Sequence, residues 1–239
     1  DSRSLMLDST LFNQQPNPVW LFDLDNTLHD ASASIFPTID GLMTASIAKL
    51  LSIAPPQANQ LRHDYWQRYG ATLIGLIKHH SIDPAHFLHL SHDFDLDTHI
   101  VSEPHLKQHL QRLPGRKMVL TNAPANYAYR VLNTLGIQSS FERVYSIEDM
   151  FLQHQCRPKP SRALMQQITH RIGVPAQNII FIDDTLRNLK AAHSLGIHTV
   201  HFAHPSTPFS AQYAGRAPYV DLRVSSIKEL SQRYSNKHL

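Results

Sequence analysis

Carboxylates occur in two close pairs, and each pair follows a short apolar segment. Asp23 and Asp25 follow residues 19–22, and Asp183 and Asp184 follow residues 178–182. Like charges this close need a cation or a shared proton, and a hard divalent cation with oxygen ligands, above all Mg²⁺, suits them. Either pair alone also fits a solvated turn or a helix cap. Two acidic segment ends together favour a shared metal site.

Two further segments carry groups that suit a phosphate. Thr121 and Asn122 end the apolar segment 117–120, and a hydroxyl and an amide there can donate to phosphate oxygens. Lys159 stands between Pro158 and Pro160, where its charge can neutralise phosphate and hold a carboxylate. Taken singly, the first pair also fits helix capping and the lysine an exposed loop.

These residues must be positioned by the elements around them, which alternate between strand and helix. We expect strands over residues 19–25, 117–122, 141–145, 178–184 and 197–201, and helices over 125–135, 161–173, 186–195 and 227–233. This alternation predicts an α/β fold with a Rossmann-like parallel sheet. Ligands bind beyond the carboxyl ends of such strands, which is where the polar groups lie.

Residues 31–105 have a different pattern. Apolar residues recur at helical spacing, with further helices around 57–69, 71–80 and 84–91 and a break at Pro55 and Pro56. We therefore predict two domains: an α/β core of residues 1–30 and 106–239, and an inserted helical cap of residues 31–105. Residues 1–18 are interpreted as a loose leader and residues 203–219 as irregular.

Composition excludes several classes of protein. The 239 residues are 42% hydrophobic and 17% charged, as in a globular chain. A single cysteine, Cys156, excludes an internal disulfide and a multi-cysteine zinc site. The net charge of +3 comes without a basic run, which gives little reason to expect nucleic-acid binding. No apolar stretch reaches the roughly 20 residues of a membrane helix. We interpret the chain as cytoplasmic; its oligomeric state, and whether residues precede Asp1, stay open.

In chain order the polar segments resemble the four motifs of the haloacid dehalogenase-like hydrolases. The motifs are Asp-x-Asp-x-Thr at 23–27, Thr-Asn at 121–122, a lysine between prolines at 158–160, and Asp-Asp-Thr-x-x-Asn at 183–188. The inserted helices resemble the C1 cap of the phosphoglycolate-phosphatase-like branch. The phrases at residues 22–28, 69–76, 115–123 and 181–184 are similar to those of pyrimidine 5′-nucleotidases.

The resemblance implies a two-step phosphatase mechanism. Asp23 would be the nucleophile, and Asp25 the general acid and base. Mg²⁺ would lie between Asp23, the backbone carbonyl of Asp25, and Asp184. The resemblance further implies that Asp183 and Asn188 assist the metal directly or through water, and that Thr121, Asn122 and Lys159 bind the phosphoryl group. Lys159 would also count among the catalytic residues.

The resemblance also places substrate specificity in the cap and near the first motif. The implied residues are His29, Tyr69, Gly70, Thr72 and Gly75. Two departures stand out: Asn188 replaces a common acidic residue, and His29 replaces a common aromatic one. The expected substrate is a small phosphorylated metabolite, a pyrimidine nucleoside 5′-monophosphate above others. Alternatives are a sugar phosphate, phosphoglycolate, a flavin-pathway intermediate or phosphomutase chemistry; a non-enzymatic binding protein is disfavoured.

Overall fold

The computed structural model describes residues 17–205 and 217–235. Most of the predicted leader, residues 1–16, lies outside the described residues, as do residues 206–216 of the segment predicted to be irregular. In the described part of the chain, no helix combines the length and apolar character needed to span a membrane.

A six-stranded sheet forms the centre of the molecule, and all of its strand pairs are parallel. The strand order is β3-β2-β1-β6-β7-β8. The strands are β1 (Val19–Phe22), β2 (Arg116–Leu120), β3 (Arg143–Tyr145), β6 (Ile179–Asp183), β7 (His198–Phe202) and β8 (Leu222–Val224). The α/β fold with a parallel sheet is therefore confirmed. β1 is central and fully buried, which explains its continuous apolar sequence.

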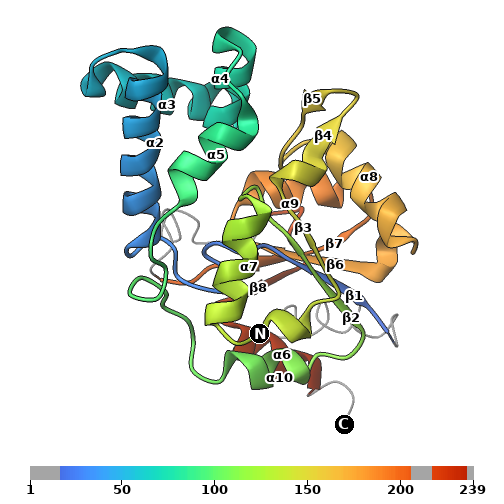
Figure 1. The fold of residues 1–239 in the computed structure, drawn as a ribbon. Coiled ribbons are helices and arrows are strands. Elements are labelled where there is room, and N and C mark those ends of the chain that lie inside the picture. Colours follow the sequence, from blue (N-terminus) through green and yellow to red (C-terminus); the bar gives the residue numbers. More distant parts are fainter. Residues whose placement is uncertain (1–16, 206–216, 236–239) are drawn as a thin grey trace.

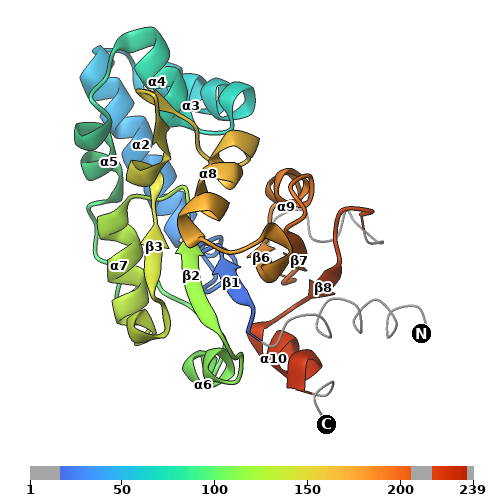
Figure 2. The same ribbon diagram turned by 90° about the vertical axis from the view of Figure 1, so that its right-hand side faces the viewer.

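Helices cover both faces of this sheet, because alternate residues of each strand point to opposite sides. Trp20 and Phe22 of β1 belong to a cluster with α6 (Leu106–Gln111), α7 (Ala125–Thr134) and α10 (Ile227–Ser235). Leu21 belongs to a second cluster with α8 (Arg162–Ile172) and α9 (Leu186–His193). Figure 2 shows α7 and α8 on opposite sides of the strands. The result is a three-layer arrangement.

Five helices lie between β1 and β2 in the chain. The first four are α2 (Ile35–Leu51), α3 (Pro55–Tyr69), α4 (Thr72–His80) and α5 (Pro84–His92), and the fifth is α6. The first four form a group above the carboxyl end of the sheet (Figure 1). We call these four helices the cap. Pro55 and Pro56 begin α3 as well as ending the previous pattern, since proline fits the first turn of a helix. The domain limits at residues 31 and 105 stay a prediction.

The two segments that join the cap to the core run side by side. The backbone N–H of Asp30 donates to the carbonyl of Val101 at 2.7 Å, and the Ser34 hydroxyl donates to the carbonyl of His99 at 2.9 Å. Arg130 of α7 donates to the carbonyls of His92 and Phe94. The second joining segment is therefore attached to the core helix by a charged side chain.

Several short elements escaped prediction. They are the strands β4 (Phe151–Leu152), β5 (Gln155–Cys156) and β8, the helix α6, and the 3₁₀ turns Gln138–Ser140, Ile147–Met150 and Ala176–Asn178. The strands β4 and β5 form an antiparallel hairpin. Elements of two to six residues are too short to show a periodicity in sequence.

Candidate active site

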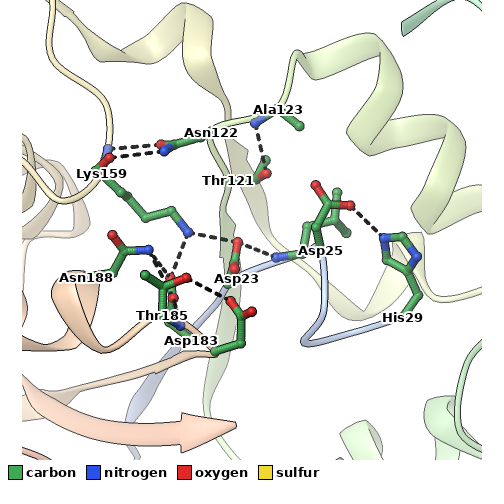
Figure 3. A network of polar contacts seen from close by, with 12 residues as sticks. Asp23, Asp25, His29, Thr121, Asn122, Ala123, Lys159, Asp183, Thr185 and Asn188 are labelled. Carbon is green, nitrogen blue, oxygen red and sulfur yellow. Dashed lines mark hydrogen bonds and ion pairs between the residues drawn. The ribbon is translucent and has the colours of Figure 1, made fainter. Parts of the chain in front are cut away.

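The predicted polar residues meet because β2, β1 and β6 are neighbours in the sheet. Asp23 directly follows β1, Thr121 directly follows β2, and Asp183 ends β6. The N–H of Asp23 donates to the carbonyl of Ile182 at 2.8 Å, so the ladder continues to the first carboxylate. Figure 3 shows these side chains converging on one point at the ends of the strands.

Lys159 lies at the centre of this group. Its Nζ is 2.8 Å from Asp23 Oδ1 and 2.8 Å from Asp183 Oδ2, and the residue is only 3% exposed. It is therefore a buried, doubly paired cation and not an exposed loop lysine. The two carboxylates raise its pKa although burial opposes this shift. Asp23 Oδ1 also accepts a hydrogen bond from the N–H of Leu24 at 2.7 Å.

Asn122 holds the backbone of Lys159 in place. Its Oδ1 accepts from the lysine N–H at 2.9 Å, and its Nδ2 donates to the lysine carbonyl at 3.1 Å. These two bonds use the amide oxygen and one of the two Nδ2 hydrogens, so the second hydrogen is left for another acceptor, and the contact with phosphate stays a prediction. The Thr121 hydroxyl accepts from the N–H of Ala123 at 3.0 Å and keeps its own hydrogen for another acceptor.

Three carboxylates form a cluster that fits a metal ion. Asp23, Asp183 and Asp184 each offer an oxygen, and these atoms lie within 4.8 Å of one another. Burial raises the pKa of Asp23 well above its usual value; Lys159 opposes the shift, while Asp183 and Asp184 add to it. Burial, followed by the charge of Asp183, raises the pKa of Asp184 to about 7. One ammonium faces three acids, so a divalent cation with oxygen ligands, such as Mg²⁺, fits this donor set.

Asp183 is fully buried, and other groups occupy both of its oxygens. Oδ1 accepts from the N–H of Thr185 at 2.7 Å, Oδ2 accepts from Lys159, and Asn188 Nδ2 lies 3.0 Å from both oxygens. A carboxylate at position 188 could not donate these bonds. This arrangement gives a physical reason for Asn188 and fits a supporting role for Asp183 and Asn188.

Asp25 belongs to a separate network on the other side of Asp23. Its Oδ1 accepts from the Tyr127 hydroxyl at 2.6 Å and lies 2.8 Å from Nε2 of His29. Burial favours the protonated form, but hydrogen bonding and the charge of His29, with the Tyr127 bond, lower the pKa of Asp25 below its usual value. The carboxylate of Asp25 is thus set apart from the acidic cluster by its partners as well as its position.

From the sequence, Tyr127 was missed as a partner of Asp25, and His29 was placed among the residues that set substrate specificity. Tyr127 lies 102 positions from Asp25 along the chain, and no motif links the two. His29 was expected to contact substrate, but its side chain is 0% exposed and faces Asp25 (Figure 3). A substrate contact by His29 does not fit this burial.

Asn26 was also missed, and it shapes the turn that follows β1. Its φ of 60° is left-handed, a conformation that asparagine tolerates better than most residues. Its Oδ1 accepts from the N–H groups of Ala31 and Ser32 at 3.1 and 3.0 Å and from the Ser32 hydroxyl at 3.0 Å. The Asn-Thr step in the first motif was a usable signal for such a turn.

The cap residues expected to set specificity divide between the site and the cap interior. A Cβ on Gly70 would lie 3.7 Å from Pro160, so this turn meets the segment that carries Lys159. The Thr72 hydroxyl donates to the carbonyl of Arg62 at 3.0 Å, and a Cβ on Gly75 would lie 2.1 Å from the Tyr65 ring. Thr72 and Gly75 therefore pack the cap. Tyr69 is half-buried, and its hydroxyl lies 2.6 Å from Nε2 of His79.

A family model described as haloacid dehalogenase-like hydrolase matches residues 19–196. The chain belongs to this family. The match runs from β1 to the turn after α9 and includes all four motif segments. The resemblance drawn from those motifs is confirmed at the level of the superfamily.

Similar proteins include a phosphate metabolism protein and a phosphoglycolate phosphatase. Phosphate metabolism protein 8 of Saccharomyces cerevisiae is 26% identical over 78% of this chain, which spans 63% of the yeast protein's length. Phosphoglycolate phosphatase of Pseudomonas putida is 26% identical over 75% of this chain and 67% of its own length.

Solved structures agree on the fold. A HAD phosphatase from Thermococcus onnurineus covers 93% of this chain and 100% of its own, with a TM-score of 0.64 and 16% identity. L-2-haloacid dehalogenase from Xanthobacter autotrophicus covers 90% of this chain and 97% of its own, with a TM-score of 0.57 and 15% identity. At these identities the likeness concerns the fold.

Proposed function

We propose that this chain is a Mg²⁺-dependent phosphatase that hydrolyses small phosphate monoesters. The observation that carries the proposal is the pair of differently held carboxylates, Asp23 and Asp25. Asp23 is bonded to Lys159 and belongs to the acidic cluster, whereas Asp25 is bonded to Tyr127 and His29. Displacement at a carbon–halogen bond needs no proton donor for a leaving oxygen, so the second carboxylate favours phosphoester chemistry over dehalogenation.

The proposed reaction has two steps. An Asp23 oxygen attacks phosphorus and forms an aspartyl-phosphate, while the bond to the leaving oxygen breaks. Asp25, ionised in the free protein, takes up a proton when the phosphate anion binds beside it and gives that proton to the leaving oxygen. Asp25 then takes a proton from the water that attacks the aspartyl-phosphate, which releases inorganic phosphate and restores Asp23.

Charge neutralisation is the second requirement of this reaction. Asp23, Asp184 and the backbone carbonyl of Asp25 would hold Mg²⁺, which supplies positive charge to the phosphoryl oxygens when bound. Lys159 screens the repulsion between Asp23 and the incoming phosphate. Asn122 and Asn188 keep Lys159 and Asp183 in place through the bonds described above.

For the substrate we propose a pyrimidine nucleoside 5′-monophosphate. The similarity of residues 22–28 and 69–76 to pyrimidine 5′-nucleotidases supports this choice. The approach of Gly70 to Pro160 supports a cap turn that reaches the leaving group. Phosphoglycolate is the second candidate, because a relative that is 26% identical to this chain is named phosphoglycolate phosphatase.

Phosphate release from a panel of esters tests both levels of the proposal. UMP, CMP, AMP, GMP, phosphoglycolate and ribose 5-phosphate are compared with Mg²⁺ and with EDTA, beside Asp23→Asn. We expect release from UMP and CMP that needs Mg²⁺ and disappears in the variant. Preference for another ester would overturn the proposed substrate but leave the proposed phosphatase reaction in place. Transfer of phosphate within a sugar phosphate, without release, would indicate a mutase. No phosphate release from any of the esters would overturn the proposal.

A further inference from the structure

Two buried side chains hold the same oxygen of Asp25. Tyr127 comes from α7, and His29 comes from the turn after β1; both contacts, at 2.6 and 2.8 Å, end on Oδ1. Tyr127 is 1% exposed, and the His29 side chain is 0% exposed. Among the described residues, no hydrogen bond reaches Oδ2, and the Asp25 side chain is 16% exposed.

The two oxygens of Asp25 are therefore not equivalent. An ionised carboxylate can only accept, so Tyr127 and His29 each supply a hydrogen to Oδ1. Rotation of the carboxylate away from this orientation would break both bonds and leave two buried donors without a partner, which is costly. The carboxylate consequently keeps one oxygen, Oδ2 in this structure, in the outward position, where a substrate can reach it.

Tyr127 is itself supported from the cap. The ring of His92, at the end of α5, packs edge-to-face against the Tyr127 ring with 5.4 Å between centroids. His92 is held in turn by Ser91, whose hydroxyl lies 2.9 Å from Nδ1. Packing on this side fixes the tyrosine and, through it, the carboxylate.

We propose that Tyr127 and His29 are positioning residues that direct Asp25 Oδ2 toward the leaving oxygen of the substrate. Neither side chain touches the substrate in this arrangement. The inference rests on the proposed phosphatase function, in which Asp25 protonates that oxygen. It gives Tyr127 and His29 a role in catalysis that does not depend on substrate recognition.

Leaving-group dependence separates this role from a general structural one. p-Nitrophenolate leaves without much need of a proton, whereas the alcohol of an alkyl ester such as UMP or ribose 5-phosphate needs one. The experiment measures kcat/KM, which covers the step that expels the leaving group, for p-nitrophenyl phosphate and for the best alkyl ester of the panel. It uses the full chain with Mg²⁺.

Tyr127→Phe removes only the hydroxyl. We expect it to lower kcat/KM for the alkyl ester by about 10- to 100-fold, part of the contribution of a general acid, and for the nitrophenyl ester by less than about threefold. Tyr145→Phe is the matched control: Tyr145 is equally buried but belongs to the cluster on the opposite face of the sheet. It should leave both rates unchanged.

His29 is tested by rescue. His29→Leu removes the donor and should reproduce the selective loss, whereas His29→Gln keeps an N–H donor at similar reach and should recover most of the alkyl-ester rate. Circular dichroism checks that each variant is folded, and the glutamine variant and Tyr127→Phe still decide the question if the leucine variant is not.

Each outcome has a separate meaning. Equal losses on both esters, or no loss, would overturn the inference while the wild-type protein still shows Mg²⁺-dependent, Asp23-dependent hydrolysis. A wild-type protein that hydrolyses neither ester would overturn the proposed function and the inference with it.

Discussion

At the scale of single residues, the clustered carboxylates of the site outnumber the ammonium group that pairs with them. Lys159 is the ammonium within the acidic cluster, and it pairs with Asp23 and Asp183 at once. Removing one partner of a buried ion pair leaves the other charge uncompensated, which costs far more than the pair contributes. We therefore expect Lys159 to affect the stability of the metal-free protein and, in the proposed reaction, the approach of a phosphate.

We predict that Lys159→Met lowers the free energy of unfolding by about 3–5 kcal/mol without metal, because two buried carboxylates lose their cation. It should also abolish measurable phosphatase activity. Urea unfolding in EDTA measures the first effect. Lys107→Met, at an exposed position of α6, is the control and should change stability by less than about 0.5 kcal/mol. Equal stabilities of the two variants would contradict the buried pairing.

The fold was predictable from sequence because its long elements carry strong patterns. The apolar segments before Asp23 and Asp183 became β1 and β6, and the order of the motifs placed their ends together. The partners of those motif residues were not predictable. Tyr127 is an ordinary tyrosine of an amphipathic helix until β1 and α7 are packed together, and the Asn122 amide finds Lys159 only across a gap of 37 positions.

At the scale of elements, the cap depends on the close approach of α3 and α4. Tyr65 of α3 lies directly over Gly75 of α4, where a Cβ would meet the ring at 2.1 Å. The Tyr65 hydroxyl also lies 2.7 Å from Nε2 of His80. The tyrosine is thus fixed at both its ring and its hydroxyl, so the glycine cannot easily be enlarged.

We predict that Gly75→Ala destabilises the protein by about 1–3 kcal/mol, because the added methyl group overlaps the ring of Tyr65. Gly41→Ala is a matched control in α2, since nothing lies within 4 Å of its Cβ position. The control should be neutral or should stabilise by up to about 1 kcal/mol, through the higher helix propensity of alanine. Guanidinium unfolding compares the two, and equal midpoints would contradict the close packing.

At the scale of the whole molecule, stability is linked to pH through the acidic cluster. The raised pKa of Asp184, about 7, means that the folded metal-free chain holds a proton which the unfolded chain releases near pH 4. The folded state binds more protons between these values, so this group's contribution to stability falls as the pH rises from about 4 to 7. A cation that binds the ionised form reverses this trend.

We predict that the rise in melting temperature produced by Mg²⁺ is larger at pH 8 than at pH 5.5. A ligand at about 100 times its Kd adds about 2.7 kcal/mol, provided that the site is ionised. Comparing Mg²⁺ with EDTA at the same pH cancels the charging of the 17 histidines. Asp184→Asn should flatten the difference between the two pH values. An equal Mg²⁺ effect at both values in the wild-type protein would count against this linkage.

The paired joining segments have a consequence for how the family can diversify. The chain leaves the core after β1 and returns before β2, and the bonds from Asp30 to Val101 and from Ser34 to His99 bring exit and return together. What lies between two adjoining points can be exchanged as a cassette without lengthening or shortening the path through the sheet. We expect helices 35–92 to be graftable between relatives, so that a new substrate range can be acquired while the carboxylates keep their places.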